Sequence, residues 1–273
     1  MKSPYSRQAA IAALAAFALA RPASAQSPES PSLVFSTFGA YLGGSSLWRV
    51  PRQLATAPVD QMDTLDLSRV VVPGFAVGMT MTLFPSPHVG YTVEVAFLGA
   101  TTESRCVVVT GFAADTAHRN QQACEYIHGR AIRTSLVALQ GGLTWRVAYR
   151  GPVQPYFRVG GGAAFIGGSF VETSGRYAWQ GQNVWQTYLG EAKHSEMTWV
   201  AAAAAGAMLE ISPGYLIRFE LRDAVMNVPV ATGPGDPRST EVIAPSGRRT
   251  VHLPMVGVAF DIALERRQGR RRY

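Results

Sequence analysis

The chain has 273 residues, of which 47% are hydrophobic and 16% charged, and its formal net charge is +7 at pH 7. The excess of positive charge lies at the two ends: without Lys2, Arg7, Arg21 and the tail that starts at Glu265, residues 26–264 carry 17 basic and 17 acidic side chains. A neutral body removes the electrostatic argument for a nucleic-acid-binding protein.

The first 25 residues have the order of a targeting segment. Lys2 and Arg7 precede the apolar run AAIAALAAFALA, and small residues follow at 23–25. This order predicts a secretory signal peptide, residues 1–25, that is cleaved on export. The apolar run is shorter than the roughly 20 residues that span a bilayer. Since no later apolar window is long enough, we expect no transmembrane helix.

Cys106 and Cys124 are the two cysteines of the chain. In an oxidising compartment a single disulfide between them is the favoured interpretation. His118 and His128 lie nearby, but the spacing of the four residues fits no familiar zinc site. We therefore expect neither a metal nor a cofactor.

An alternation of period two predicts eight strands after the signal peptide. The predicted strands are residues 32–43, 74–84, 89–99, 132–149, 155–167, 196–211, 215–226 and 251–264. An even number of strands allows an antiparallel meander to close with both chain ends on one side.

The connections between these strands alternate in length. Three are tight turns rich in proline and glycine, residues 85–88, 150–154 and 212–214. Four are long and polar, residues 44–73, 100–131, 168–195 and 227–250. Transmembrane barrels have short turns on one rim and long loops outside the cell on the other.

Bulky apolar residues occupy one face of most predicted strands, and small or charged residues occupy the other. Strands longer than those of soluble proteins favour lipid on the bulky face. A narrow eight-stranded interior also has no room for eight bulky faces. Aromatic residues near the strand ends predict an interfacial girdle, namely Tyr91, Tyr149, Tyr156, Phe157, Trp199 and Tyr215.

The stretch PYFRVGGGAAFIGGSF shows how the two faces differ. Phe157, Val159 and Phe165 are predicted to face acyl chains, while Arg158 points into the lumen, where Gly160 and Gly162 leave it room. Because an unpaired buried charge is costly, we expect a lumenal ion-pair network. Its predicted members are Glu94, Arg158, Glu210, Arg218, Glu220 and Arg222.

From residue 32 to 264 the chain resembles the small eight-stranded outer-membrane barrels of the OmpA-transmembrane and OmpX type, in segments such as PYFRVGGGAAFIG and HLPMVGVAFDIAL. The resemblance implies an all-β, antiparallel up-and-down barrel over residues 26–264. It also implies a place in the bacterial outer membrane, in contact with its lipid and lipopolysaccharide. The sequence leaves the oligomeric state open, and a monomer is favoured. Such barrels usually end on an aromatic residue, whereas a basic tail, residues 265–273, follows Leu264 here.

The leading functional hypothesis is a structural or surface-interaction role with four displayed loops and a plugged lumen. Aromatic residues in loop 168–195, spaced by amides, suit contact with an extracellular ligand. They are Tyr177, Trp179, Trp185 and Tyr188. The simpler interpretation is that they pack on other loops or touch the lipopolysaccharide zone.

Three alternatives remain. A small pore would need an open lumen, and a soluble secreted barrel would bind an apolar ligand inside. An outer-membrane lipid-modifying hydrolase would need a nucleophile and base that converge. His194, Ser195 and Glu196 are adjacent in sequence, and neighbours along a strand point to opposite faces. We therefore expect no enzyme.

Overall fold

The computed structural model describes residues 32–56, 62–110, 118–190, 195–234 and 245–264. The predicted signal peptide, His194 and the basic tail lie outside the described residues. Among the described residues, no helix combines the length and apolar character needed to cross a membrane.

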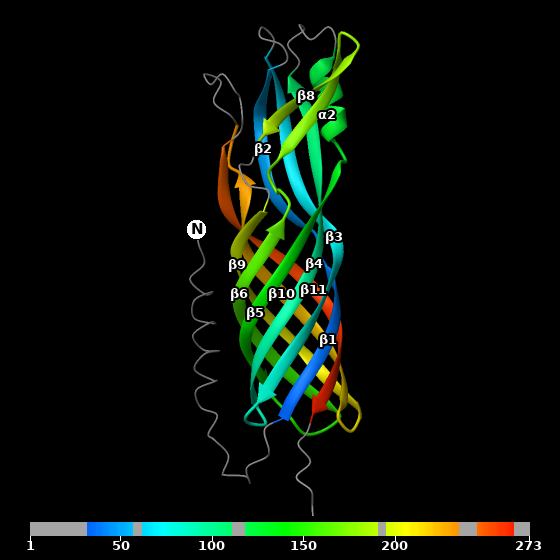
Figure 1. Cartoon of the computed structure of the whole chain (residues 1–273), viewed down its shortest axis with the longest axis vertical. Coiled ribbons are helices and arrows are strands. Elements are labelled where there is room, and N and C mark those ends of the chain that lie inside the picture. The colour runs from blue at the N-terminus through cyan, green and yellow to red at the C-terminus, as the bar shows by residue number, and fades with distance from the viewer. Residues whose placement is uncertain (1–31, 57–61, 111–117, 191–194, 235–244, 265–273) are drawn as a thin grey trace, which may run out of the picture. The chain divides into compact units, whose positions relative to one another are not determined.

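Eight strands form a closed antiparallel ring (Figure 1). They are β1 (Ser32–Leu42), β3 (Met62–Phe84), β4 (Val89–Thr110), β5 (Ala131–Arg146), β6 (Val153–Gly167), β9 (Ser195–Ser212), β10 (Tyr215–Ala231) and β11 (Ser246–Leu264). β1 closes the ring because it pairs with β11 on one side and with β3 on the other. The predicted eight-stranded up-and-down barrel is confirmed. Closure leaves no edge strand whose backbone groups would lack partners in lipid.

The outer wall of the ring is apolar. Val93 is 51% exposed, Phe219 48% and Phe260 42%, whereas Glu94 and Arg218, their neighbours toward the lumen on β4 and β10, are buried. A soluble barrel would bury the first set and expose the second. An exposed apolar wall of this extent needs hydrocarbon around it.

The four segments predicted as long loops contain helix and strands, so the prediction that they are irregular was wrong. They contain β2 (Ser45–Thr56), α2 (Arg119–Ile127), β7 (Thr173–Trp179), β8 (Gln182–Leu189) and the continuations of β3, β4, β10 and β11. We call the described residues of 44–73, 100–131, 168–190 and 227–250 the lobe. Figure 1 shows it at the end of the barrel opposite the short turns.

A bulge in β3 explains why the sequence pattern appeared to start a strand at Gly74. The pairing of β3 with β4 shifts register between Val72 and Phe75. The buried residues of β3 are even-numbered after the bulge, as at Ala76, and odd-numbered before it, as at Leu67. A bulge adds one residue and so exchanges the two faces of the strand. The alternation is therefore interrupted although the strand continues.

One apolar core fills the lobe and the adjoining half of the ring. Its members include Leu47, Trp48, Leu65, Leu67, Leu98, Leu136, Ile166, Met226 and Leu253. The expectation that only small or ionic groups line the lumen therefore holds only around buried charges such as Glu94 and Arg158. A second, smaller apolar cluster of Tyr156, Met208 and Leu216 lies toward the short turns. Toward the lobe the inward residues meet other side chains, so large apolar groups pack there without water.

Candidate functional site

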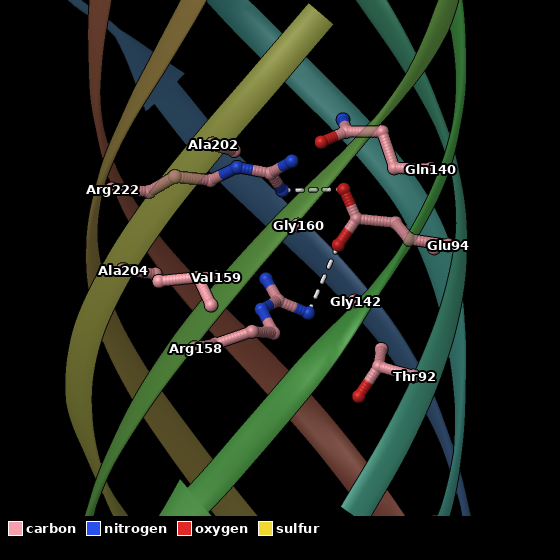
Figure 2. A pocket seen from close by; sticks show the side chains of 11 residues that line it. Thr92, Glu94, Gln140, Gly142, Arg158, Val159, Gly160, Ala202, Ala204 and Arg222 are labelled. Carbon is pink, nitrogen blue, oxygen red and sulfur yellow. Dashed lines mark ion pairs between the residues drawn. The ribbon is translucent and has the colours of Figure 1, made fainter.

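A carboxylate lies between two guanidinium groups inside the barrel (Figure 2). Glu94 on β4 forms ion pairs with Arg158 of β6, at 2.9 Å, and with Arg222 of β10, at 2.5 Å. Arg158 also pairs with Glu220 at 2.6 Å. Three strands therefore share one ion-pair cluster, and Gly160 and Gly142 leave space beside it.

The cluster continues toward the short turns. Tyr156 donates its hydroxyl hydrogen to Glu220 at 2.6 Å. Arg218 lies 3.6 Å from Asp261 and 3.9 Å from Glu220. It also donates to the hydroxyl of Thr80 at 3.4 Å. Charge inside the ring is thus arranged in alternating signs, which is the arrangement that lowers the cost of its burial.

The structure brings together five of the six predicted lumenal residues and places Glu210 elsewhere. Glu210 is exposed near the short turn, where the pairing of β9 with β10 shifts register at the start of β10. Asp261 and Tyr156 belong to the cluster but were not predicted there. Tyr156 was assigned to the girdle with Phe157, although adjacent strand residues face opposite sides. Strand parity alone would have placed Tyr156 beside Arg158 and Asp261 beside Ala259.

The lumen near this cluster holds little free space. The cavity bounded by Glu94, Arg158 and Arg222 has a volume of about 20 Å³. Two further cavities deeper in the ring have about 10 Å³ each, one beside Arg218 and one beside Leu98. Each volume is of the size that holds about one water molecule.

The lobe is held by a disulfide and by buried polar contacts. Cys106 of β4 is bonded to Cys124 of α2, with their Cα atoms 5.3 Å apart. Asn120 donates to Asp63 at 2.8 Å. Arg69, which is fully buried, donates to Ser104 at 3.1 Å and to the carbonyl of Glu172 at 2.6 Å. These contacts fix α2 and the start of β7 on the strands of the lobe.

Asp66 supports a strained turn in β2. It accepts the backbone N–H of Arg52 at 2.9 Å and the side chain of Arg49 at 3.1 Å. Arg52 has a φ of 53°, in the left-handed region. Two hydrogen bonds lower the pKa of the Asp66 carboxyl below its ordinary value. The larger effect comes from the backbone N–H of Arg52, and the smaller one from the side chain of Arg49. The carboxylate therefore remains charged, and keeps this turn, at any pH above that ordinary value.

The four predicted aromatic residues of loop 168–195 have different environments. They lie on the hairpin formed by β7 and β8. Trp185 is 56% exposed and Trp179 37%, whereas Tyr188 is buried in the lobe core and Tyr177 is half-buried against it. Only the two tryptophans are therefore available to a ligand, since the tyrosines serve packing.

Basic residues accompany these tryptophans. Arg119 lies 3.3 Å from the ring centre of Trp179. At the other end of α2, the Tyr126 ring meets Trp185 edge-on at 5.3 Å and lies under both Arg130 and Arg176. The sequence predicted a role for the tryptophans but not for these arginines. About 50 residues of chain separate α2 from the hairpin, and only the fold places the two side by side.

Of the three residues considered for catalysis, only Glu196 has a described side chain. Glu196 forms an ion pair with Arg248, and the side chain of Ser195 lies outside the described residues. His252 contacts Asp223 at 2.7 Å on the outer wall. Within the described ranges, no group of three or more His, Cys, Asp or Glu side chains could hold a metal ion.

Fold and interior together define an eight-stranded transmembrane β-barrel with an apolar outer wall and buried ion pairs in its lumen. No protein-family model and no curated protein sequence matches the chain.

Several solved structures are similar to this chain in fold. Neisserial surface protein A has 8% identity and a TM-score of 0.43, covering 86% of this chain and 99% of its own. The outer membrane protein OprG from Pseudomonas aeruginosa has 9% identity and a TM-score of 0.42, with coverages of 88% and 99%. The outer membrane protease OmpT from Escherichia coli has 8% identity and a TM-score of 0.40, with coverages of 89% and 99%. Likeness at this level concerns the fold and says nothing of activity.

Loss of the disulfide is expected to loosen the lobe without unfolding the barrel. In a Cys106→Ala/Cys124→Ala variant, α2 loses a cross-link between residues 18 positions apart, a closure worth about 3 kcal/mol. Limited proteolysis should then cut near α2 faster than in the parent chain. The folded band on an unboiled gel should stay unchanged, because the ring pairs through its own backbone. Equal proteolysis rates for the two chains would contradict this role.

Proposed function

We propose that this chain is a plugged outer-membrane barrel whose function is surface interaction through the lobe. In this proposal residues 1–25 direct export and are removed, residues 26–264 form the barrel and lobe, and the tail 265–273 remains on the periplasmic side. The lobe then faces the cell exterior, as long connections do in such barrels.

One observation carries the proposal: the part of the chain beyond the lipid-facing ring also forms ordered structure. The lobe has a hairpin, a helix, a disulfide and an apolar core that continues into the ring. Simple connecting loops need none of these, since loops commonly stay irregular and mobile. A rigid projecting lobe is suited to holding binding side chains in fixed positions.

The filled lumen argues against the pore alternative. Ion pairs around Glu94 and the apolar core beyond it fill much of the lumen, and the three cavities described above are each of the size of about one water molecule. The purified chain should therefore give no stable conductance steps in planar bilayers. Reproducible steps of porin size would overturn the plugged barrel.

The exposed apolar wall argues against the alternative of a soluble barrel. A soluble barrel would fractionate with the periplasm instead of the membrane.

Shortening the β7–β8 hairpin tests the surface role. A variant in which residues 174–187 are replaced by a short Gly-Ser linker removes both exposed tryptophans but keeps Phe170, Val171 and Leu189, which belong to the lobe core. Cells displaying this variant should lose attachment to host-cell or matrix-coated surfaces. The heat-dependent gel shift of the folded barrel should remain, which shows that insertion is intact. Attachment equal to that of the parent chain, or none by either chain, would contradict the surface role.

Neither Glu196 nor the pair of His252 and Asp223 on the outer wall supports an enzymatic proposal. Glu196 is engaged by Arg248. The contact of His252 with Asp223 is exposed on both sides, with 66% and 44% of the two side chains accessible. We therefore propose a binding protein whose ligand meets the lobe.

A further inference from the structure

Two arginines lie against one tyrosine ring on the surface of the lobe. The guanidinium of Arg130 is 4.9 Å from the ring centre of Tyr126, and that of Arg176 is 5.1 Å from it. The edge-on contact with Trp185 at 5.3 Å completes the group. Arg130 also lies 6.0 Å from the ring of Trp185. We call these four residues the arginine–aromatic cluster.

The cluster is formed by α2, by Arg130 in the segment that follows it, and by the β7–β8 hairpin, and contacts between these parts fix their relative position. Tyr126 is on α2, whose Cys124 is bonded to β4. Arg176 and Trp185 are direct partners across the β7–β8 pair, so they share one face of the hairpin. The backbone N–H of Ala178 donates to the side chain of Gln122 at 3.0 Å, which joins the hairpin to α2. The cluster is therefore held in place before any ligand arrives.

The charge of the cluster is open to a ligand. Arg130, Arg176 and Trp185 are exposed. Within the described part of the chain, neither arginine has a carboxylate at ion-pair distance. Two positive groups held around one ring repel each other, and an anion between them would relieve that repulsion. Contact with the Tyr126 ring attracts each guanidinium while its N–H groups can still donate to a ligand.

We propose that this cluster binds an anionic saccharide, a sugar that carries sulfate, phosphate or carboxylate groups. The inference rests on the proposed surface function and gives it a ligand class. The guanidinium forks match the paired oxygens of such groups. The exposed face of Trp185 offers an apolar platform for a sugar ring beside them. An acidic peptide would use the arginines but would leave the tryptophan face unused.

Binding to a matched pair of sugars tests the proposal. The full chain in lipid nanodiscs is titrated with a sulfated dextran oligosaccharide and with unsulfated dextran of the same length, at low and high salt. We expect the sulfated sugar alone to bind, and its affinity to fall as salt rises. A phosphorylated core oligosaccharide of lipopolysaccharide forms a third arm. Tighter binding in that arm assigns the site to a bacterial sugar, and tighter binding of the sulfated sugar assigns it to a host-type polymer.

Variants locate the binding on the cluster. Arg130→Gln/Arg176→Gln should weaken binding of the charged sugar by at least about tenfold, since each lost charge-assisted contact contributes appreciably. Trp185→Ala should weaken it severalfold. The matched control is Arg105→Gln, because Arg105 is an exposed lobe arginine outside the cluster, and it should leave binding unchanged. The folded gel band confirms that each variant inserts.

Three results would overturn the inference: no binding of either charged sugar, equal binding by the double variant, or a poly-glutamate peptide that binds as tightly as the sulfated sugar. If cells still attach through the hairpin while no charged sugar binds, the surface function stands and only the ligand class fails. If attachment itself does not need the hairpin, the surface function fails first.

Discussion

Val95→Arg is expected to lower the free energy of unfolding of the barrel by about 2–4 kcal/mol in lipid vesicles. Val95 lies in the apolar belt on β4, between Met79 and Leu139 of the neighbouring strands, and is 49% exposed on the outer wall. A charge there must enter hydrocarbon, which offers it neither water nor a counter-ion. Urea titration, followed by the folded band on unboiled gels, measures the loss.

Val107→Arg is the matched control for this experiment. It makes the same change on the same strand, at a residue that is 58% exposed but belongs to the lobe. Because that part of β4 belongs to the lobe and not to the lipid-facing ring, the arginine should stay in water and change stability by less than about 0.5 kcal/mol. If both variants insert equally well, the outer wall does not face lipid.

A lumenal residue is not a suitable control. Thr80 faces the lumen, but it is buried and accepts a hydrogen bond from Arg218. Thr80→Arg would place another positive group in a packed cluster, so we expect it to destabilise the barrel as well. The lumen is charged, and it is also full.

Glu94→Gln is expected to destabilise the barrel by about 3–5 kcal/mol. The change removes the negative charge between Arg158 and Arg222 and keeps the size of the side chain. Arg158 retains Glu220, but Arg222 would be left buried without its carboxylate. Equilibrium unfolding in vesicles measures the effect.

Removal of the second charge should recover much of this loss. In Glu94→Gln/Arg222→Gln, no arginine stays uncompensated, so the double variant should be more stable than Glu94→Gln alone. Glu196→Gln serves as the comparison because it breaks the more exposed pair with Arg248, a change worth less than about 1 kcal/mol. If Glu94→Gln costs no more than Glu196→Gln, the lumenal cluster does not stabilise the fold.

The sequence by itself determined the ring and the direction of its faces. Alternation of apolar with small or charged residues is a local property, because successive side chains on a strand point to opposite sides whatever they pair with. Phe157 and Arg158 could therefore be assigned to lipid and lumen from their neighbours alone. The unequal connections set the order of the strands around the ring in the same way, since a short turn joins adjacent strands.

Only the tertiary structure decided what lies beyond the belt. The bulge at Gly74 exchanges the faces of β3, and a pattern that changes phase reads as the end of a strand. The pairing of Arg130 and Arg176 around Tyr126 depends on contact between α2 and a hairpin far along the chain. The spacing of residues along the chain does not predict such a contact. The filling of the lumen likewise depends on which inward side chains meet across the ring, and that is set by strand register.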